Sequence, residues 1–441
     1  MCSLYSSNLL MESTESMKYF QLVWLCWAFC LNGFNNGIIG PSLPDLAENI
    51  HRHVNEINVI LPTTSAGNFI GILISSACLK FKSMYLFITV SLLLGAIATF
   101  FIPLAGNLTN TLILFFLQGL SKGLVDAYCY ALCLCLFPSN HNWQMLSLPV
   151  ASAFSGLTIA FIVRAFQSHS IIYSNANITS ITECTKDTCY TTPNRISYPY
   201  MIVSLILVPP ILAFFYYFIE ELLKKVKRVD YTVILDLPSV RSVNLKGKLA
   251  FIILIFLFHI PVYGSIITYS HLLTLYGISS PLFQSKSVMA TITALFWGSV
   301  LLGRITNVFL SRYISMQVLL TLNFVGLVIF TTTLFLFKFE IAYIWVGSSG
   351  YGFFQSSFLP SVMTWAGSFL ELDVIILYTS LMANGVGEIV IPYTAVLMFQ
   401  HISHKVLMIL IFSLSLIELG LFLAICYLKR IHNKKNNHII F

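Results

Sequence analysis

Lys122 and Asp126 place two opposite charges one helical turn apart within residues 119–134, a stretch that otherwise consists mainly of Leu, Ala, Tyr and Cys. Side chains four residues apart share one face of a helix, so the two groups can touch. In one interpretation they form a structural ion pair that neutralises both charges. In the other, Asp126 faces a central cavity, where a carboxylate can hold a cation or a proton and accept hydrogen bonds from solute hydroxyls. Lys122 would then tune the carboxylate or extend toward the membrane surface. We favour the second interpretation and keep the first as its alternative.

Uncharged polar residues recur in similarly apolar surroundings. Asn35 and Asn36 lie beside Gly33 and Gly37, and irregular, glycine-flanked backbone in a membrane span often lines a cavity. Their amides can instead form hydrogen bonds between helices. The same two interpretations apply to Asn68, Gln118, Gln355 and Asn384.

Aromatic and titratable residues give weaker candidates. Trp297 and Trp365 offer a flat apolar face on which a ring-shaped solute can stack, although such residues are more often packing or interfacial residues. His259 and His271 could carry protons, but a neutral, hydrogen-bonded histidine is the commoner case. Glu418 has no evident partner in the sequence.

The composition explains why these residues stand out. Of the 441 residues, 57% are hydrophobic and 9% are charged, whereas about a quarter of a soluble domain is charged. Apolar runs long enough to cross the roughly 30 Å hydrocarbon core recur along the whole chain. They are continuous and do not alternate, which excludes a barrel. Twelve spans are predicted, at 19–41, 57–79, 84–104, 110–136, 144–166, 198–220, 249–276, 288–310, 317–337, 342–366, 374–399 and 406–428.

The loop charges predict the orientation of these spans. Most of the 24 Lys and Arg residues fall in the loops and tails on one side, which predicts that both termini are cytoplasmic. Two glycosylation sequons, at Asn107 and Asn177, fall on the other side. The loop at about 167–197 also holds Cys184 and Cys189, which could form a disulfide on that oxidising side or remain free. The first run is too long for a cleaved signal peptide and is expected to stay in the protein.

Several functional classes are disfavoured by the sequence. The formal net charge of +7 follows from the membrane topology and indicates contact with anionic lipid headgroups, and it is no argument for nucleic acid. We find no phosphate-binding Gly-rich loop, which argues against ATP-driven transport, and no catalytic constellation or metal-ligand spacing. We therefore expect a non-enzyme without cofactor or metal, driven by a gradient or by the solute itself.

The organisation is that of two halves. Residues 1–220 form an N-terminal six-helix bundle, 221–248 a basic cytoplasmic linker, and 249–441 a C-terminal six-helix bundle with a basic tail. The predicted fold class is all-α integral membrane, with twelve transmembrane helices in two six-helix, pseudo-symmetric bundles. Weak similarities support a repeat, because Phe69-Ile70-Gly71 parallels Phe296-Trp297-Gly298 in the corresponding span of the second half.

Short segments in matching order give the chain a family resemblance. They are Gly40-Pro41-Ser42-Leu43-Pro44-Asp45-Leu46, Gly119 to Asp126, Phe296-Trp297-Gly298-Ser299 with Gly303-Arg304, Ser356-Ser357-Phe358-Leu359-Pro360, and Gly387-Glu388 with Pro392. The chain resembles the major facilitator superfamily, and within it the sodium-dependent glucose transporter 1 and MFSD4 group. This resemblance implies two bundles with alternating access and a hexose-like substrate. It also implies gating or structural roles for three charges, Asp45, Glu388 and Arg304, with Arg304 pairing an acidic residue to close the cytoplasmic side.

Two positions depart from the family pattern. Tyr130 stands where relatives usually have Asn, and a phenol offers fewer hydrogen bonds to a sugar diol than an amide does. The segment Tyr263-Gly264-Ser265-Ile266 lacks the acidic residue that relatives often carry in span seven.

Three functional hypotheses follow. The first is a transporter for a small polar solute, with a hexose such as glucose as the default, in the plasma membrane, with sodium or protons as coupling ions. The second is a transport-inactive solute sensor or partner-binding membrane protein. The third is an organic-ion carrier of the same fold.

Overall fold

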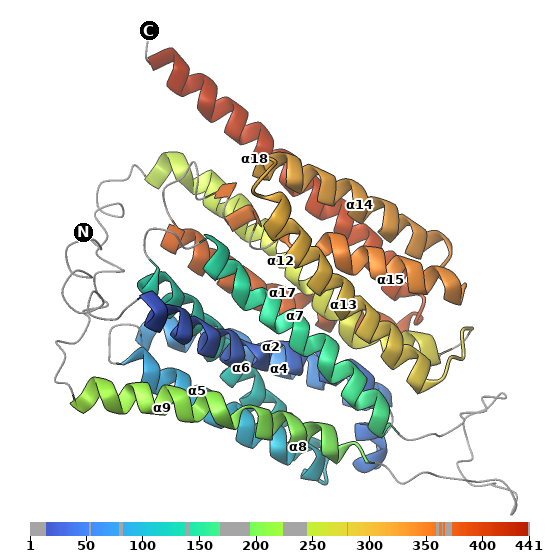
Figure 1. Ribbon diagram of the computed structural model, residues 1–441. Helices are drawn as coiled ribbons and strands as arrows, with labels where there is room; N and C mark the ends of the chain where they lie inside the picture. The colour runs from blue at the N-terminus through green and yellow to red at the C-terminus, as the bar shows by residue number, and fades with distance from the viewer. Residues whose placement is uncertain are drawn as a thin grey trace, which may run out of the picture.

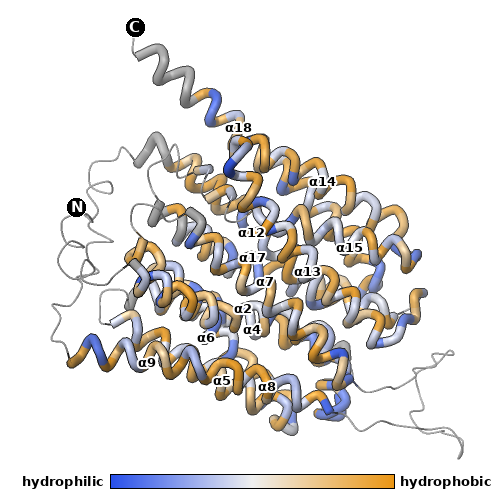
Figure 2. The backbone as a smooth tube through the Cα atoms, viewed as in Figure 1, coloured by the Kyte–Doolittle hydropathy of each residue, from blue (hydrophilic) through white to orange (hydrophobic). Residues whose placement is uncertain are grey.

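The computed structural model is built from long helices that run roughly parallel to one another (Figure 1). It describes residues 15–52, 54–78, 83–137, 142–167, 195–223, 245–279, 281–358, 361–363, 365–366 and 373–439. Among these residues there is no strand, and ten helices are long and apolar enough to cross a membrane. Figure 2 shows apolar residues along nearly every helix, as the high hydrophobic content predicts.

The N-terminal half contains the helices before the linker. Its spans are α2 (Glu15–Asn49), α4 (Ile60–Cys78), α5 (Met84–Phe101), α6 (Leu108–Leu136), α7 (Asn142–Phe166), and α8 (Ser197–Ile206) with α9 (Val208–Leu223). A short helix, α3 (Val54–Ile57), precedes α4, and a 3-10 turn, η1 (Ile102–Leu104), follows α5. The sixth span is one predicted run made of two helices that meet at Leu207, because Pro209 and Pro210 lack the N–H groups that would continue the hydrogen-bond ladder.

The C-terminal half contains α12 (Leu245–Ile278), α13 (Lys286–Leu310), α14 (Met316–Leu336), α15 (Ile341–Gln355), α17 (Asp373–His401) and α18 (Val406–Ile439). The tenth span was predicted to continue to residue 366, but α15 ends at Gln355 and a turn follows at Ser356 and Ser357. Helical residues resume after this turn, at 358, 361–363 and 365–366.

Helix contacts repeat between the halves. In the first half α2 packs on α7 and α4 packs on α6; in the second half α12 packs on α17 and α13 packs on α15. The third and last spans of each half also pair, α5 with α8 and α9 and α14 with α18. The halves meet where α7 packs on α13, α4 on α17 and α2 on α12 (Figure 1). The prediction of two pseudo-symmetric six-helix bundles is confirmed, while the exact linker boundaries stay a prediction because residues 224–244 lie outside the described residues.

Candidate functional site

Lys122 of α6 forms an ion pair with Glu388 of α17, and this pair joins the two halves in the middle of the spans. The two side chains are only 3% and 2% exposed. Lys122 Nζ also donates a hydrogen bond to Asn36 Oδ1 of α2, at 3.0 Å. The partner of Lys122 is therefore an acid 266 residues away in the chain and not Asp126 on its own helix.

Two glycines of α6 bring Lys122 to this position. A Cβ atom on Gly119 would overlap the Thr64 carbonyl of α4, and one on Gly123 would overlap the Asn68 carbonyl. Small residues at such places let membrane helices approach closely. Asn68 consequently lies beside Lys122, and its Nδ2 donates to the second carboxylate oxygen of Glu388.

Asp126 lies one turn from Lys122 toward the predicted cytoplasmic end of α6. Its Oδ1 accepts a hydrogen bond from Asn32 Nδ2 of α2. The residue is 8% exposed, compared with 2% for Lys122. Within the described part of the chain, no Lys, Arg or His forms an ion pair with Asp126. This carboxylate is thus held by an amide and is not neutralised by direct contact with a cation.

Tyr263 of α12 lies beside Lys122. Lys122 Nζ lies over its ring, 5.8 Å from the centroid, which is within the range of a cation–π contact. From the sequence, the Tyr263 segment was noted only because it lacks the acidic residue that relatives often carry. Nothing in that segment indicates that Glu388, on another helix, pairs with the lysine over the Tyr263 ring.

The ends of α2 and α13 form a second ion cluster between the halves. Lys286 Nζ lies 2.7 Å from Asp45 Oδ1 and 2.7 Å from Glu48 Oε1. Lys286 and Asp45 are buried, whereas the Glu48 side chain is 46% exposed. This cluster lies on the side that the loop charges predict to be extracellular. Lys286 was not among the predicted site residues. The sequence did contain a signal for it, because this lysine stands at the start of one span and two acids stand at the end of another span.

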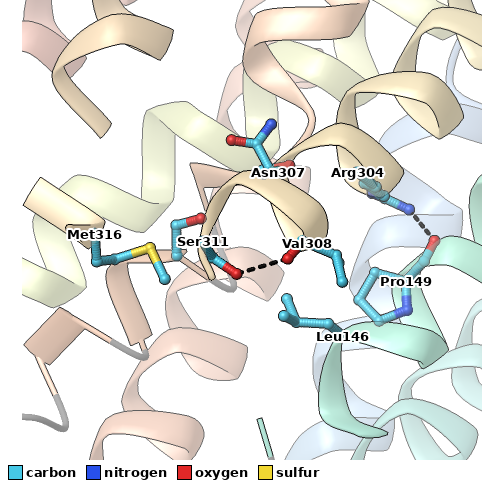
Figure 3. Close-up of a pocket in the computed structure, with 9 residues that line it drawn as sticks. Leu146, Pro149, Arg304, Asn307, Val308, Ser311 and Met316 are labelled. Carbon is cyan, nitrogen blue, oxygen red and sulfur yellow. Dashed lines mark hydrogen bonds between the residues drawn. The ribbon is translucent and has the colours of Figure 1, made fainter. Parts of the chain in front are cut away.

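Arg304 of α13 holds the opposite end. Its Nη1 donates to the Pro149 carbonyl of α7, in the other half (Figure 3). Its Nε donates to the Ser356 carbonyl at 3.2 Å. The resemblance implied an acidic partner for Arg304. Among the described residues, its hydrogen bonds go to backbone carbonyls instead. A small pocket lies beside it, lined by Leu146, Pro149, Arg304, Asn307, Val308, Ser311, Met316, Ser357 and Ser361 (Figure 3).

Trp297 lies in the contact between α13 and α7. Its Nε1 donates to Ser270 Oγ at 3.0 Å, and Ser270 Oγ in turn donates to the Asn36 carbonyl at 3.3 Å. Gly156 of α7 lies against the indole, since a Cβ on that glycine would be 2.9 Å from Trp297 Cδ2. The ring face is therefore covered by the opposite half in this conformation.

Two six-helix halves that share a buried polar site are the arrangement of a large transporter family. The model of the Major Facilitator Superfamily matches residues 25–392.

The chain belongs to the major facilitator superfamily.

Individual relatives support the assignment. The chain is 21% identical over 375 residues to the mouse sodium-dependent glucose transporter 1A, covering 83% of this chain and 86% of the relative. It is 27% identical over 132 residues to the human major facilitator superfamily domain-containing protein 4A, covering 30% of this chain and 26% of that protein. The group predicted from the short segments is thus found, at low identity.

Solved structures show the same major facilitator fold. The xylose transporter XylE from E. coli, in a partially occluded inward-open conformation, matches with a TM-score of 0.69 and 11% identity, covering 92% of this chain and 96% of that chain. A variant of the E. coli fucose:proton symporter FucP matches with a TM-score of 0.60 and 15% identity, covering 93% and 99%. This chain is therefore a multi-pass membrane protein with a transporter fold.

The remaining polar candidates divide between the central site and the interior of each half. Asn384 lies one turn before Glu388 on α17, and its Oδ1 has no hydrogen-bond partner. Asn35 is 1% exposed, and neither atom of its amide group is hydrogen-bonded. Gln118 Nε2 donates to Thr99 Oγ1 at 2.9 Å within the N-terminal half, and Gln355 faces Glu418 within the C-terminal half. Tyr130 packs edge-on against Phe29, with ring centroids 5.2 Å apart.

The predicted modification sites lie away from these groups. Asn107 is exposed at the start of α6, where its Oδ1 accepts from the Asn110 backbone N–H at 2.8 Å. Asn177, Cys184 and Cys189 lie outside the described residues.

Proposed function

We propose that this protein moves a small neutral polar solute, of the hexose class, across the plasma membrane by alternating access, with both termini cytoplasmic and a cation gradient as the driving force. The single observation that carries the proposal is the buried Lys122–Glu388 pair, which joins the two halves inside a polar layer. Rocking of one half against the other must break this contact, and a solute bound at the same place would replace it.

The charge balance favours a neutral solute. Lys122 and Glu388 offset each other in the central layer, and Asp126 is held there by the Asn32 amide. An organic ion would bring an uncompensated charge into this layer, at a high cost in the membrane interior. The third hypothesis, an organic-ion carrier, is therefore less well supported than a carrier of sugars.

Unused hydrogen-bonding groups favour a polyol. The Oδ1 atoms of Asn32, Asn68 and Asn384 are buried and have no partner, although each belongs to a residue in or one turn from the charged layer. A buried acceptor without a hydrogen bond costs roughly 1–3 kcal/mol, which a bound hydroxyl or a water can recover. A sugar supplies several hydroxyl donors at once. The similar proteins include transporters of glucose, xylose and fucose, which agrees with this solute class.

The contacts at the two ends support an alternating mechanism. On the predicted extracellular side, Lys286 of one half binds Asp45 and Glu48 of the other. On the predicted cytoplasmic side, Arg304 of one half donates to the Pro149 carbonyl of the other, next to a pocket. Opening one end requires its own contacts and the central Lys122–Glu388 pair to break, while the contacts of the other end can stay in place.

The test is uptake of labelled hexoses into liposomes that contain the purified protein, with and without a sodium or proton gradient. We expect wild-type uptake above that of empty liposomes, and a loss of about tenfold or more in Glu388→Gln and in Asp126→Asn, corresponding to at least about 1.4 kcal/mol. The control is Glu56→Gln, which removes the acid of the exposed Arg52–Glu56 pair and should leave uptake unchanged.

Three results would overturn the proposal. Movement of a charged organic solute in place of any sugar would favour the organic-ion carrier. Binding of a sugar without uptake would favour the solute sensor. Uptake that Asp126→Asn and Glu388→Gln leave intact would place the transport path elsewhere.

A further inference from the structure

A second buried carboxylate, Glu418 of α18, lies inside the C-terminal half, away from the layer around Lys122. It is 1% exposed. Within the described residues no Lys, Arg or His forms an ion pair with it, and the titratable side chain that senses its charge is Tyr351 of α15. An ionisable group in the membrane interior is expensive, and such groups commonly mark ion or proton paths.

Two neutral side chains hold Glu418. Gln355 Nε2, at the end of α15, lies 3.1 Å from Glu418 Oε2 and 3.3 Å from Oε1. Ser265 Oγ of α12 lies 3.1 Å from Glu418 Oε1. The carboxylate is thus surrounded by hydrogen-bond donors from two other helices.

The hydrogen-bonding groups around Glu418 can serve both of its protonation states. Ser265 Oγ lies within reach of two acceptors, Glu418 Oε1 and the Val262 carbonyl at 3.2 Å, but it has one hydrogen. When Glu418 is ionised, that hydrogen bonds the carboxylate, and Gln355 Nε2 serves Glu418 and the Val262 carbonyl at 3.0 Å. When Glu418 is protonated, its O–H donates to Ser265 Oγ, whose own hydrogen turns to Val262. Rotation of one hydroxyl therefore accompanies the gain or loss of one proton.

We propose that Glu418, held by Gln355 and Ser265, is a proton-binding site through which a proton gradient drives the solute cycle. This proposal rests on the transport function proposed above. The proton reaches the carboxylate from water and forms an O–H bond at Oε1. Among the described residues, Gln355 Oε1 is a buried acceptor without a hydrogen-bond partner. A sodium ion would need oxygen ligands where the Gln355 amide presents its donor nitrogen.

Adjacent contacts connect this site to the other half. Gln355 is the last residue of α15, and the carbonyl of the next residue, Ser356, accepts from Arg304 Nε. The same Arg304 reaches Pro149 of the N-terminal half. Protonation of Glu418 weakens its attraction for the Gln355 amide and so loosens the end of α15 on which Arg304 rests. Proton binding would thereby be linked to the contact that closes the predicted cytoplasmic side.

The first test observes the proton directly. Infrared difference spectra between acid and alkaline pH are recorded on the full-length protein in liposomes. We expect a carboxylic C=O component in the wild type that is absent in Glu418→Gln and is present in Glu340→Gln, which changes an exposed acid at the start of α15. In Glu418→Asp the component should persist at a shifted frequency, which keeps the test valid if Glu418→Gln does not fold. A spectrum that is the same in the wild type and both Glu418 variants would overturn the proposal.

The second test measures coupling. In the wild type, a gradient of about one pH unit, acid outside, should sustain about tenfold accumulation of a transported hexose if one proton moves with each solute. In Glu418→Gln, the ratio of gradient-driven uptake to solute exchange should fall by about the same factor, and in Glu340→Gln it should not fall. Accumulation driven by sodium and not by protons would overturn the proposal. If the wild type moves no solute, the transport function fails, and the infrared result still decides whether Glu418 binds a proton.

Discussion

Lys122 and Glu388 form a buried ion pair between helices that belong to opposite halves of the protein. Each carboxylate oxygen of Glu388 is used, one by Lys122 Nζ and the other by Asn68 Nδ2. The contact is thus both an electrostatic link and a hydrogen-bonded junction of α4, α6 and α17. Because this contact crosses the interface between the halves, its strength affects the stability of this conformation and the barrier to rocking of the halves.

Removing one partner of this pair should destabilise the protein strongly. We expect Glu388→Gln or Lys122→Met alone to lower the stability of the folded state by about 3–5 kcal/mol, because each leaves an uncompensated buried charge or polar group. The double variant should recover part of this loss. Thermal unfolding in detergent, followed by tryptophan fluorescence in a double-mutant cycle, measures the coupling. The exposed Arg52–Glu56 pair is the matched control and should show at most ~1 kcal/mol.

The Lys286 cluster should control the predicted extracellular side. Lys286→Met removes the cation that binds Asp45, so the ends of α2 and α13 should separate more often. Spin labels at the exposed positions His51 and Pro281 would report this as a longer and broader distance distribution in Lys286→Met than in the wild type. Lys405→Met, which removes an exposed cation, should leave the distribution unchanged. An unchanged distribution in Lys286→Met would show that the cluster does not hold this side closed.

Gly33 is expected to be essential for packing within the N-terminal half. A Cβ at this position of α2 would overlap the Ser152 carbonyl of α7, and a backbone atom has little freedom to move away. Gly33→Ala should therefore destabilise the fold by about 1–3 kcal/mol or more, seen as a lower unfolding temperature and less monodisperse protein. Gly420→Ala is the control, because no atom lies within 4 Å of its added Cβ, and it should be neutral or slightly stabilising. Equal effects of the two substitutions would contradict the close α2–α7 approach.

The sequons provide a test of orientation. If the loops at Asn107 and Asn177 face the lumen during synthesis, protein made in a eukaryotic secretory pathway should carry N-linked glycan on at least one of them. Enzymatic removal of N-glycans should then raise the electrophoretic mobility, and the double variant Asn107→Gln, Asn177→Gln should already run at the higher mobility. A tag at either terminus that is protected from protease in intact cells gives an independent check. Glycan at an asparagine on the opposite side would reverse the predicted topology.

The sequence by itself determined that this is a helical membrane protein with two halves. Apolar runs of about 20 residues can satisfy their backbone in a bilayer only as helices, so the spans follow from composition alone. The cost of burying charge likewise identified Lys122 and Asp126 as residues of interest without knowledge of their neighbours, and the family resemblance added Arg304 and Glu388.

Only the tertiary structure decided which of these groups meet. Spacing along one helix suggested Lys122 with Asp126, but the close approach of α4 and α6 at Gly119 and Gly123 directs Lys122 toward Glu388. In the same way, Gln355 was a candidate for the solute site. The packing of α15 within the C-terminal half instead places its amide against Glu418. Partners in such a fold lie far apart in the chain, and their distance in space is set by how helices pack, which local sequence does not encode.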